Sequence, residues 1–187
     1  QTGRCPLVYA LDIREAPLQK AAALVERFGM EAQIRCILSD GLDALGPEDL
    51  DDVVIAGMGG DTIAGILERV PWLRSPDKNL VLVPATSDEA LRSFLAENGY
   101  TVWEERAVEA KKRFYAVLRA SYTGEKRHLG PLEVRVGGVP ARTAAARGYL
   151  AKAMRNLGKE LAGKESSPRF SVGEQAALMR QLEEVLK

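Results

Sequence analysis

The stretch that most constrains this fold is Asp52–Gly60, which reads DVVIAGMGG. Its β-branched apolar run, residues 53–55, stops at Ala56, and three glycines follow within the next four residues. This pattern predicts a buried parallel strand that opens into a glycine turn and then a helix over Ile63–Val70. Glycine adopts positive φ and lets backbone approach a ligand closely, and open α/β sheets bind ligands beyond the carboxyl ends of their strands. A ligand site is one interpretation of this turn, and a tight strand–helix connection without a ligand is the other.

The rest of the first two thirds of the chain alternates apolar runs with helical patterns. Strands are predicted over residues 7–11, 34–38, 79–83, 100–104 and 114–120, and helices over 17–28 and after a capping box formed by Thr86 and Glu89. Strands separated by single helices predict βαβ units in a mostly parallel sheet, with the last two strands antiparallel.

From Thr143 onward the pattern becomes helical. Apolar residues recur at three- and four-residue steps, the sequence Ser166-Ser167-Pro168 interrupts them, and a second capping box, Ser171 with Glu174, starts another run. We therefore expect a helical hairpin with a narrow apolar seam, and a division into residues 1–125 and a helical part, residues 126–187.

Composition excludes several classes of protein. No run approaches the roughly 20 apolar residues of a membrane span, and two cysteines, Cys5 and Cys36, suit a reduced cytosolic protein better than a disulfide framework. One histidine, His128, and no CxxC motif argue against a metal site. We expect a cytoplasmic protein that binds neither membrane nor metal.

The net charge of zero hides a strong asymmetry. Residues 1–105 hold 9 Lys and Arg against 18 Asp and Glu, whereas residues 106–187 hold 17 against 8. An acidic part followed by a basic part indicates contact with a polyanion. The alternative is a solvated helical surface that happens to be rich in Arg and Lys.

Polar or glycine residues follow three successive predicted strands: Asp12, Asp40-Gly41 and Ala56–Gly60. A carboxylate at such a strand end can accept hydrogen bonds from both ribose hydroxyls, and a carboxylate at the next can accept one from the exocyclic amine of adenine. Glycines let the rest of the ligand lie close to the backbone. Together they describe a cradle for an adenosyl group. The glycines do not spell G-x-G-x-x-G, and no G-x-x-x-x-G-K-[ST] loop is present, which argues against a dinucleotide fingerprint and a P-loop.

These motifs resemble the bacterial tRNA (adenine-N1)-methyltransferase family that modifies adenine 22 of tRNA. The matching strings, in order, are YALDI, DGL, IAGMGG, LVLVP, NGY and FYAV, followed by HLGPL before the helical hairpin. The resemblance implies a Rossmann-like class I methyltransferase fold, S-adenosylmethionine as cofactor, tRNA as partner and a helical C-terminal extension that engages the tRNA. The cofactor-binding residues that it implies are Asp12, Ile13, Asp40, Gly41, Leu42, Ala56, Gly57, Met58 and Gly59.

Two features depart from the family pattern. The family's first strand and its acidic, glycine-containing cofactor loop should precede Gln1 in the sequence. In the sheet, that strand would lie between the strands that end at Asp12 and Ala56. We therefore expect an N-terminally truncated sheet. A chain without that strand is expected to bind the cofactor poorly and to be inactive, and one with it restored to bind. The family often has Gln-Pro-Asn where this chain has Val83-Pro84-Ala85, so no side chain at that position is assigned to the target base.

Adenine N1 carries a lone pair at neutral pH, so its methylation requires alignment and exclusion of water more than a strong base. Because N1 lies on the Watson–Crick edge, the base must be unpaired or extruded. Basic side chains of the second half would hold phosphates. The candidates are Lys111, Lys112, Arg113, Arg142, Arg147, Lys152 and Arg155.

Three functions remain open from the sequence. The first is transfer of a methyl group from S-adenosylmethionine to N1 of an adenine in tRNA. The second is a class I methyltransferase acting on another RNA or a small molecule, and the third is a non-catalytic RNA-binding or assembly module with a degenerate fold.

Overall fold

The computed structural model describes residues 5–162 and 172–186, which form two compact units, Gln1–Leu50 and Asp51–Lys187. Each unit is compact because most of its contacts lie within it. The boundary expected after residue 125 separates two functional parts of the chain, and it stays a prediction.

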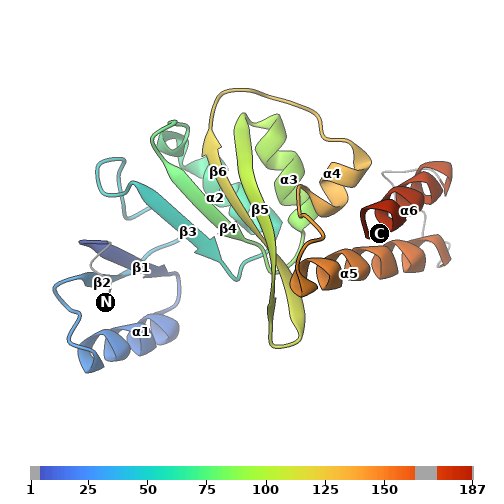
Figure 1. Cartoon of the computed structure of the whole chain (residues 1–187). Helices are drawn as coiled ribbons and strands as arrows, with labels where there is room; N and C mark the ends of the chain where they lie inside the picture. Colours follow the sequence, from blue (N-terminus) through green and yellow to red (C-terminus); the bar gives the residue numbers. More distant parts are fainter. Residues whose placement is uncertain (1–4, 163–171, 187) are drawn as a thin grey trace. The chain divides into compact units, whose positions relative to one another are not determined.

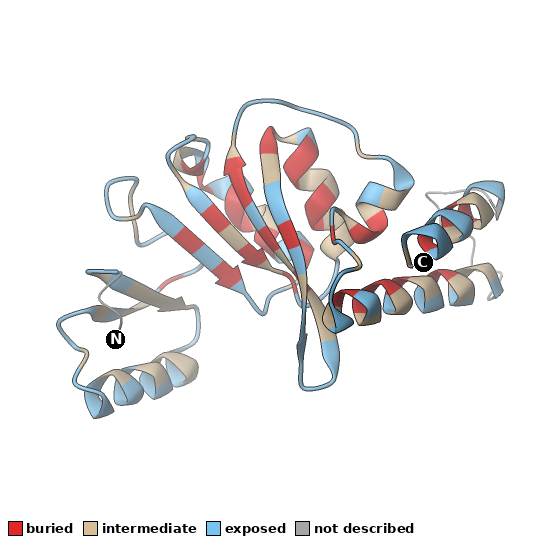
Figure 2. Cartoon of the chain, in the orientation of Figure 1, coloured by how far each residue is buried: buried red, intermediate tan, exposed pale blue. Residues whose placement is uncertain are grey.

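The first unit is a single βαβ element. Strands β1 (Val8–Asp12) and β2 (Ile34–Leu38) are parallel, and α1 (Glu15–Arg27) connects them (Figure 1). The helix begins two residues before Pro17, where we placed its start, and Gly29 follows its end with φ +61°, a conformation that favours glycine. No residue of α1 is buried, and only Ser39 and Leu42 are buried among the described residues of this unit (Figure 2).

The second unit contains a mixed four-stranded sheet in the order β3-β4-β6-β5. Strands β3 (Asp52–Ala56) and β4 (Asn79–Val83) are parallel, while β6 (Arg113–Tyr122) pairs antiparallel with both β4 and β5 (Tyr100–Ala110). The predicted antiparallel arrangement of the last two strands is confirmed, and both strands run further than their apolar cores indicated. The further strand expected between β1 and β3 stays a prediction.

Helices α2 (Gly60–Arg69) and α3 (Asp88–Glu97) lie side by side against one face of this sheet, and a short 3-10 helix, η1 (Pro71–Leu73), follows α2 (Figure 1). Alternate residues of β3 and β4 face these helices, and the core is made of fully buried aliphatic side chains: Ile63, Leu67, Leu73, Leu80, Leu82, Leu91, Leu95 and Leu118. Burial concentrates here rather than in the first unit (Figure 2), because two helices and the sheet enclose this face together.

The capping box predicted at Thr86 is wrong. Helix α3 has Ser87 as its N-cap residue, in the left-handed conformation with φ +55°, and no side chain caps it. Thr86 instead forms a parallel β-bridge with Gly59. This bridge holds the backbone of Thr86 away from the position that an N-cap residue requires. Helix α2 also begins three residues earlier than predicted, directly at Gly60.

The C-terminal part is helical, as expected. Helices α5 (Ala144–Ala162) and α6 (Val172–Leu186) pack against each other along a seam that buries Leu150, Leu157, Leu178 and Leu182. A short helix that we did not predict, α4 (Pro131–Val136), precedes them. The predicted helix break at Ser166–Pro168 and the cap at Ser171 lie outside the described residues. In the described part of the chain, no helix is long and apolar enough to cross a membrane.

Candidate active site

The glycine turn after β3 has open space above it. Gly57 adopts φ +80°, and its N–H donates to the carbonyl oxygen of Val83 at 3.1 Å. A Cβ atom built at Gly57 would meet no atom within 4 Å. Glycine is therefore required here by its backbone conformation, and the space beside it is free for a ligand.

The same turn is joined to the loop after β4. The N–H of Ala85 donates to the carbonyl of Met58, and the N–H of Gly60 donates to the carbonyl of Thr86, each at 2.8 Å. A Cβ built at Gly60 would lie 2.0 Å from the carbonyl oxygen of Ser87. Gly57 thus leaves space beside the turn, and Gly60 permits close packing of two loops. The ligand site at this turn stays a prediction.

In the first unit, the predicted cofactor residues lie at one edge of the β1–β2 sheet. Asp12 ends β1 and Asp40 follows β2, at the carboxyl ends of two parallel strands. The carboxylate of Asp12 accepts from the N–H of Arg14 at 2.8 Å, Ile13 is exposed, Gly41 has φ +62°, and Leu42 is buried. The structure thus gathers Asp12–Ile13 and Asp40–Leu42 in one unit and Ala56–Gly59 in the other.

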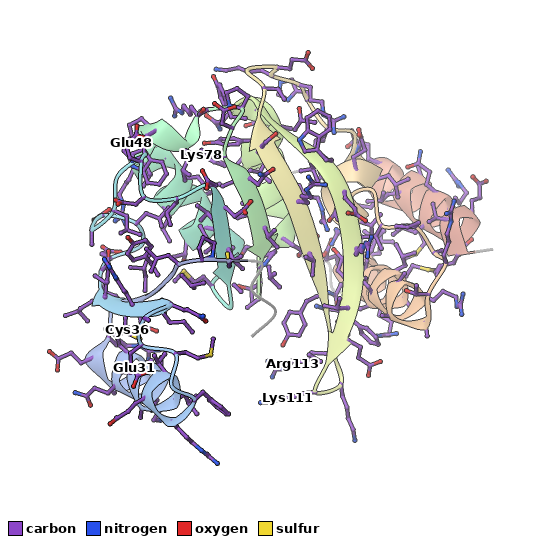
Figure 3. The ribbon with its side chains drawn as sticks, turned by 60° about the vertical axis from the view of Figure 1, so that its left-hand side comes forward. Glu31, Cys36, Glu48, Lys78, Lys111 and Arg113 are labelled. Carbon is purple, nitrogen blue, oxygen red and sulfur yellow. The ribbon has the colours of Figure 1, made fainter. Side chains whose placement is uncertain are left out.

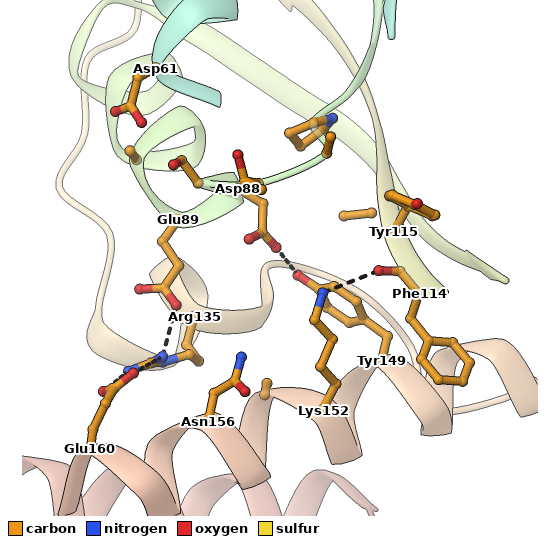
Figure 4. A pocket seen from close by; sticks show the side chains of 17 residues that line it. Asp61, Asp88, Glu89, Phe114, Tyr115, Arg135, Tyr149, Lys152, Asn156 and Glu160 are labelled. Carbon is orange, nitrogen blue, oxygen red and sulfur yellow. Dashed lines mark hydrogen bonds and ion pairs between the residues drawn. The ribbon is translucent and has the colours of Figure 1, made fainter. Parts of the chain in front are cut away.

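A cleft of about 530 Å³ opens beside the glycine turn, within the second unit (Figure 4). One wall is the β4–α3 loop and the start of α3, residues 84–90, together with Asp61. A second wall is the beginning of β6, residues 114–116. The third is α5, which contributes Tyr149, Lys152, Ala153, Asn156 and Glu160, while Arg135 of α4 closes one end. We call this the α5 cleft.

Ion pairs occupy that closed end of the α5 cleft. The guanidinium of Arg135 donates to both carboxylate oxygens of Glu160, at 2.9 and 2.7 Å, and lies 2.9 Å from a carboxylate oxygen of Glu89 (Figure 4). Burial raises the pKa of Glu89 and outweighs the opposing effect of Arg135. One guanidinium thus faces two carboxylates at this end of the cleft.

A buried arginine holds the walls of the cleft together. The Arg92 side chain is 2% exposed, and it donates to Glu105 of β5 at 2.6 and 2.8 Å, to the carbonyls of Val134 and Arg135, and to the Tyr149 hydroxyl at 2.6 Å. The Tyr149 hydroxyl in turn donates to Asp88. Burial lowers the pKa of Arg92, but Glu105, Tyr149 and Asp88 together outweigh this effect and raise the pKa above its ordinary value.

The Tyr149 hydroxyl also has a shifted pKa. Burial raises the pKa of Tyr149, and the Asp88 carboxylate raises it further, against the lowering effect of Arg92. The hydroxyl therefore keeps its proton and remains a hydrogen-bond donor. Helices α3, α4 and α5 and strand β5 are thus fixed to one another by groups that were not among the predicted site residues.

All seven predicted RNA-binding residues are exposed. Lys111 and Lys112 form the turn of the long β5–β6 hairpin, both with positive φ, and Figure 3 shows Lys111 and Arg113 at its far end. The ring of Phe114 packs against Gly148 of α5, where an added Cβ would lie 2.3 Å from the ring. This contact joins the hairpin to α5, which carries Arg147, Lys152 and Arg155.

The α5 side of the cleft is what sequence reasoning missed. Tyr149 and Asn156 fall within the predicted helical segment, where periodicity shows which residues face a core but not that a second element forms a cleft there. Lys152 was predicted for RNA contact, and its ammonium donates to the carbonyl of Phe114 at 3.4 Å.

Within residues 5–162 and 172–186, no three His, Cys, Asp or Glu side chains are placed to hold a metal ion.

Comparison with known proteins gives a consistent result. A family model described as a methyltransferase domain matches residues 1–118. A tRNA (adenine(22)-N(1))-methyltransferase of Bacillus subtilis is 31% identical over 109 residues, which are 58% of this chain and 46% of that protein. The matched region thus spans about half the length of this curated relative.

Solved structures are similar over nearly the whole chain. A putative tRNA (m1A22) methyltransferase of Streptococcus pneumoniae, in complex with S-adenosyl-L-methionine, has a TM-score of 0.80 and 25% identity, with 99% of this chain and 83% of that chain covered. TrmK of M. capricolum, in complex with S-adenosyl-homocysteine, has a TM-score of 0.74 and 26% identity, with 97% and 82% covered. The similarity therefore extends beyond residue 118 into the C-terminal helices.

Proposed function

The chain belongs to the methyltransferase domain family, and from this premise we propose that it transfers a methyl group from S-adenosylmethionine to N1 of an adenine in tRNA. The observation that carries the proposal is the junction of the glycine turn with the α5 cleft. The Met58–Ala85 and Gly60–Thr86 hydrogen bonds hold a turn with free space directly beside a cleft of nucleotide size. The similarity to tRNA m1A22 methyltransferases supports adenine N1 as the acceptor.

The residues present fit the cofactor. Gly57 has the free space that a close-lying ligand requires, and Asp12 and Asp40 supply carboxylates at the ends of two parallel strands. In this proposal Asp12 holds the ribose, Asp40 and Gly41 hold the adenine, and Ala56–Gly59 lie along the methionine portion. When bound, the cofactor supplies an electrophilic methyl group on a sulfonium.

The residues of the chain align the acceptor and exclude water. The target base, extruded from its stack, would enter the α5 cleft with N1 toward the glycine turn. N1 needs no general base because it carries a lone pair at neutral pH, so alignment by the rigid cleft walls is the main contribution. Arg92 maintains that alignment by fixing α3, β5 and α5 to one another.

The tRNA would be held by the exposed basic residues of the hairpin turn and α5. These side chains lie on two elements that Phe114 joins at Gly148, which supports a role for both elements in holding phosphates. We place the activity in the cytoplasm, where Cys5 and Cys36, both free thiols, would stay reduced.

The proposal is tested with a chain that carries the expected first strand, since the chain without it is expected to be inactive; this protein is the parent for the variants below. It is incubated with unmodified tRNA transcripts and methyl-labelled S-adenosylmethionine, and the modified nucleotide is mapped. Incorporation at adenine N1 is the expected result. Incorporation into another nucleotide class, or into small molecules alone, would replace tRNA adenine as the substrate. Asp12→Ala is expected to abolish cofactor binding and leave tRNA affinity nearly unchanged, since the two sites use different residues; loss of both would point to misfolding.

The tRNA interface has a test with a built-in folding control. Replacing Lys111-Lys112 by Asn-Gly removes two charges and installs the residues that a turn with two positive φ values prefers, so the hairpin should fold at least as well. The slope of log affinity for tRNA against log salt should fall by about two if both lysines contact phosphates. An unchanged slope would remove the hairpin turn from the interface.

A further inference from the structure

The α5 cleft contains polar side chains that have no hydrogen-bond partner among the described residues, and Asn156 is the carboxamide among them. Most of the charged groups are paired: Glu89 and Glu160 pair with Arg135, Asp88 accepts from Tyr149, and Lys152 donates to a carbonyl, while Asp61 has no such partner. Asn156 of α5 also lines the cleft and points into it (Figure 4), and no described residue is its hydrogen-bond partner. Its amide is therefore available to a ligand.

We propose that Asn156 is a specificity-determining residue that recognises the N6 and N7 edge of the target adenine. This inference rests on the proposed function and assigns part of base recognition to α5, outside the segment that the methyltransferase domain model matches. It gives the C-terminal helices a role inside the cleft in addition to holding tRNA.

The chemistry of the two partners supports this assignment. An asparagine amide donates through its NH₂ group and accepts through its carbonyl oxygen. Adenine offers the complementary pair on one edge, an acceptor at N7 and a donor at N6, and Asn binds this pair through two hydrogen bonds. That edge is not the one that reacts, so N1 remains free to face the glycine turn.

The surroundings of Asn156 suit a flat base. Tyr115 lines the wall that β6 contributes to the cleft, whereas the ring of Phe114 packs against Gly148. Ala153, one turn of α5 before Asn156, leaves room beside it. Aromatic side chains stack on extruded bases without choosing among them, so discrimination falls to a polar group. Guanine presents acceptors at both O6 and N7 and cannot satisfy the same amide.

The experiment uses tRNA transcripts that carry either adenosine or 7-deazaadenosine at the methylated position. The 7-deaza base keeps N1 and N6 and lacks the N7 acceptor. For the parent protein we expect kcat/KM to fall by about 10-fold or more on the 7-deaza substrate. For Asn156→Ala we expect a fall of about 10- to 100-fold on adenosine and no further loss on 7-deazaadenosine.

Matched controls separate this role from a structural one. Arg155→Ala changes the neighbouring exposed residue of α5; it should weaken tRNA binding while the parent's preference for adenosine over 7-deazaadenosine is retained. Asn156→Ala should leave tRNA affinity nearly unchanged and fold normally, because Asn156 is an exposed helix residue and alanine has the higher helix propensity.

Two outcomes would overturn the inference. Equal rates on adenosine and 7-deazaadenosine with the parent protein would show that N7 is not recognised. An undiminished preference in Asn156→Ala would show that another group recognises it. Both outcomes require that the parent methylates tRNA, so they differ from failure of the proposed function, in which no transcript is methylated.

Discussion

Replacing Arg92 by methionine tests whether the buried guanidinium holds the second unit together. The variant keeps a long apolar side chain and removes hydrogen bonds to Glu105, to two carbonyls of α4 and to Tyr149. The Glu105 side chain, 3% exposed, would be left as a charge with one backbone donor, the N–H of Gly138 at 3.0 Å.

The magnitude follows from that unpaired charge. Summing the lost bonds separately overstates the effect, because each also replaced a bond to water. Breaking a buried ion pair by removing one partner costs about 3–5 kcal/mol, against a total stability of about 5–15 kcal/mol for a typical domain. With a urea m-value of about 2 kcal/mol/M, the unfolding midpoint should fall by about 2 M.

Tryptophan fluorescence is a selective assay, because both tryptophans, Trp72 and Trp103, lie in the second unit. The companion variant Arg92→Met with Glu105→Gln removes the unpaired charge and keeps an acceptor for Gly138, so it should be more stable than Arg92→Met alone. A loss below about 1 kcal/mol in Arg92→Met, or additive effects in the double variant, would refute the reasoning.

Three further predictions concern other parts of the chain. Gly60→Ala should destabilise the second unit and abolish methyl transfer, because the added Cβ would overlap the carbonyl of Ser87. The control Gly65→Ala, whose added Cβ would meet no atom within 4 Å, should stabilise α2 by up to about 1 kcal/mol. Urea unfolding measures both changes in stability. The raised pKa of Glu89 means that the folded state binds its proton more tightly than the unfolded state does. This stability is present below the unfolded pKa and is lost as the pH rises through the folded pKa. Glu89→Gln should therefore gain stability relative to the parent as the pH rises above about 4, and a constant difference would contradict this. Backbone amides of β1 and β2 should exchange with solvent faster than those of β4 and β6, because the first unit buries only two of its described side chains, and mass-spectrometric hydrogen exchange measures this directly. Equal protection of the two strand pairs would count against it.

The sequence predicted most elements because their signals are local. Residues 34–38 and 79–83 form strands with the predicted bounds, since an apolar run that ends at a polar residue or a proline carries its own boundaries. Thr86 was assigned wrongly because its alternative partner, Gly59, is 27 positions away, and a capping pattern cannot show that competition.

The candidate site likewise has one part that the sequence predicted and one part that it did not. The glycine turn and the two aspartates were predicted because glycine and acidic residues directly follow predicted strands. The α5 cleft was not, because Asn156 and Tyr149 meet Asp61 and Asp88 only after the C-terminal helices have packed against the hairpin. Arg92 gave no signal because an arginine in an amphipathic helix is ordinarily on its solvated side.

The hydrogen bonds that join Met58 to Ala85 and Gly60 to Thr86 couple the glycine turn to the loop after β4. In the proposed reaction, a substitution that shifts the loop beside the acceptor base would therefore also displace the turn beside the methyl donor. Substitutions that alter substrate choice are therefore more readily made in α5. Its side chains line the cleft without belonging to either loop, so they can be exchanged while the two loops stay in place.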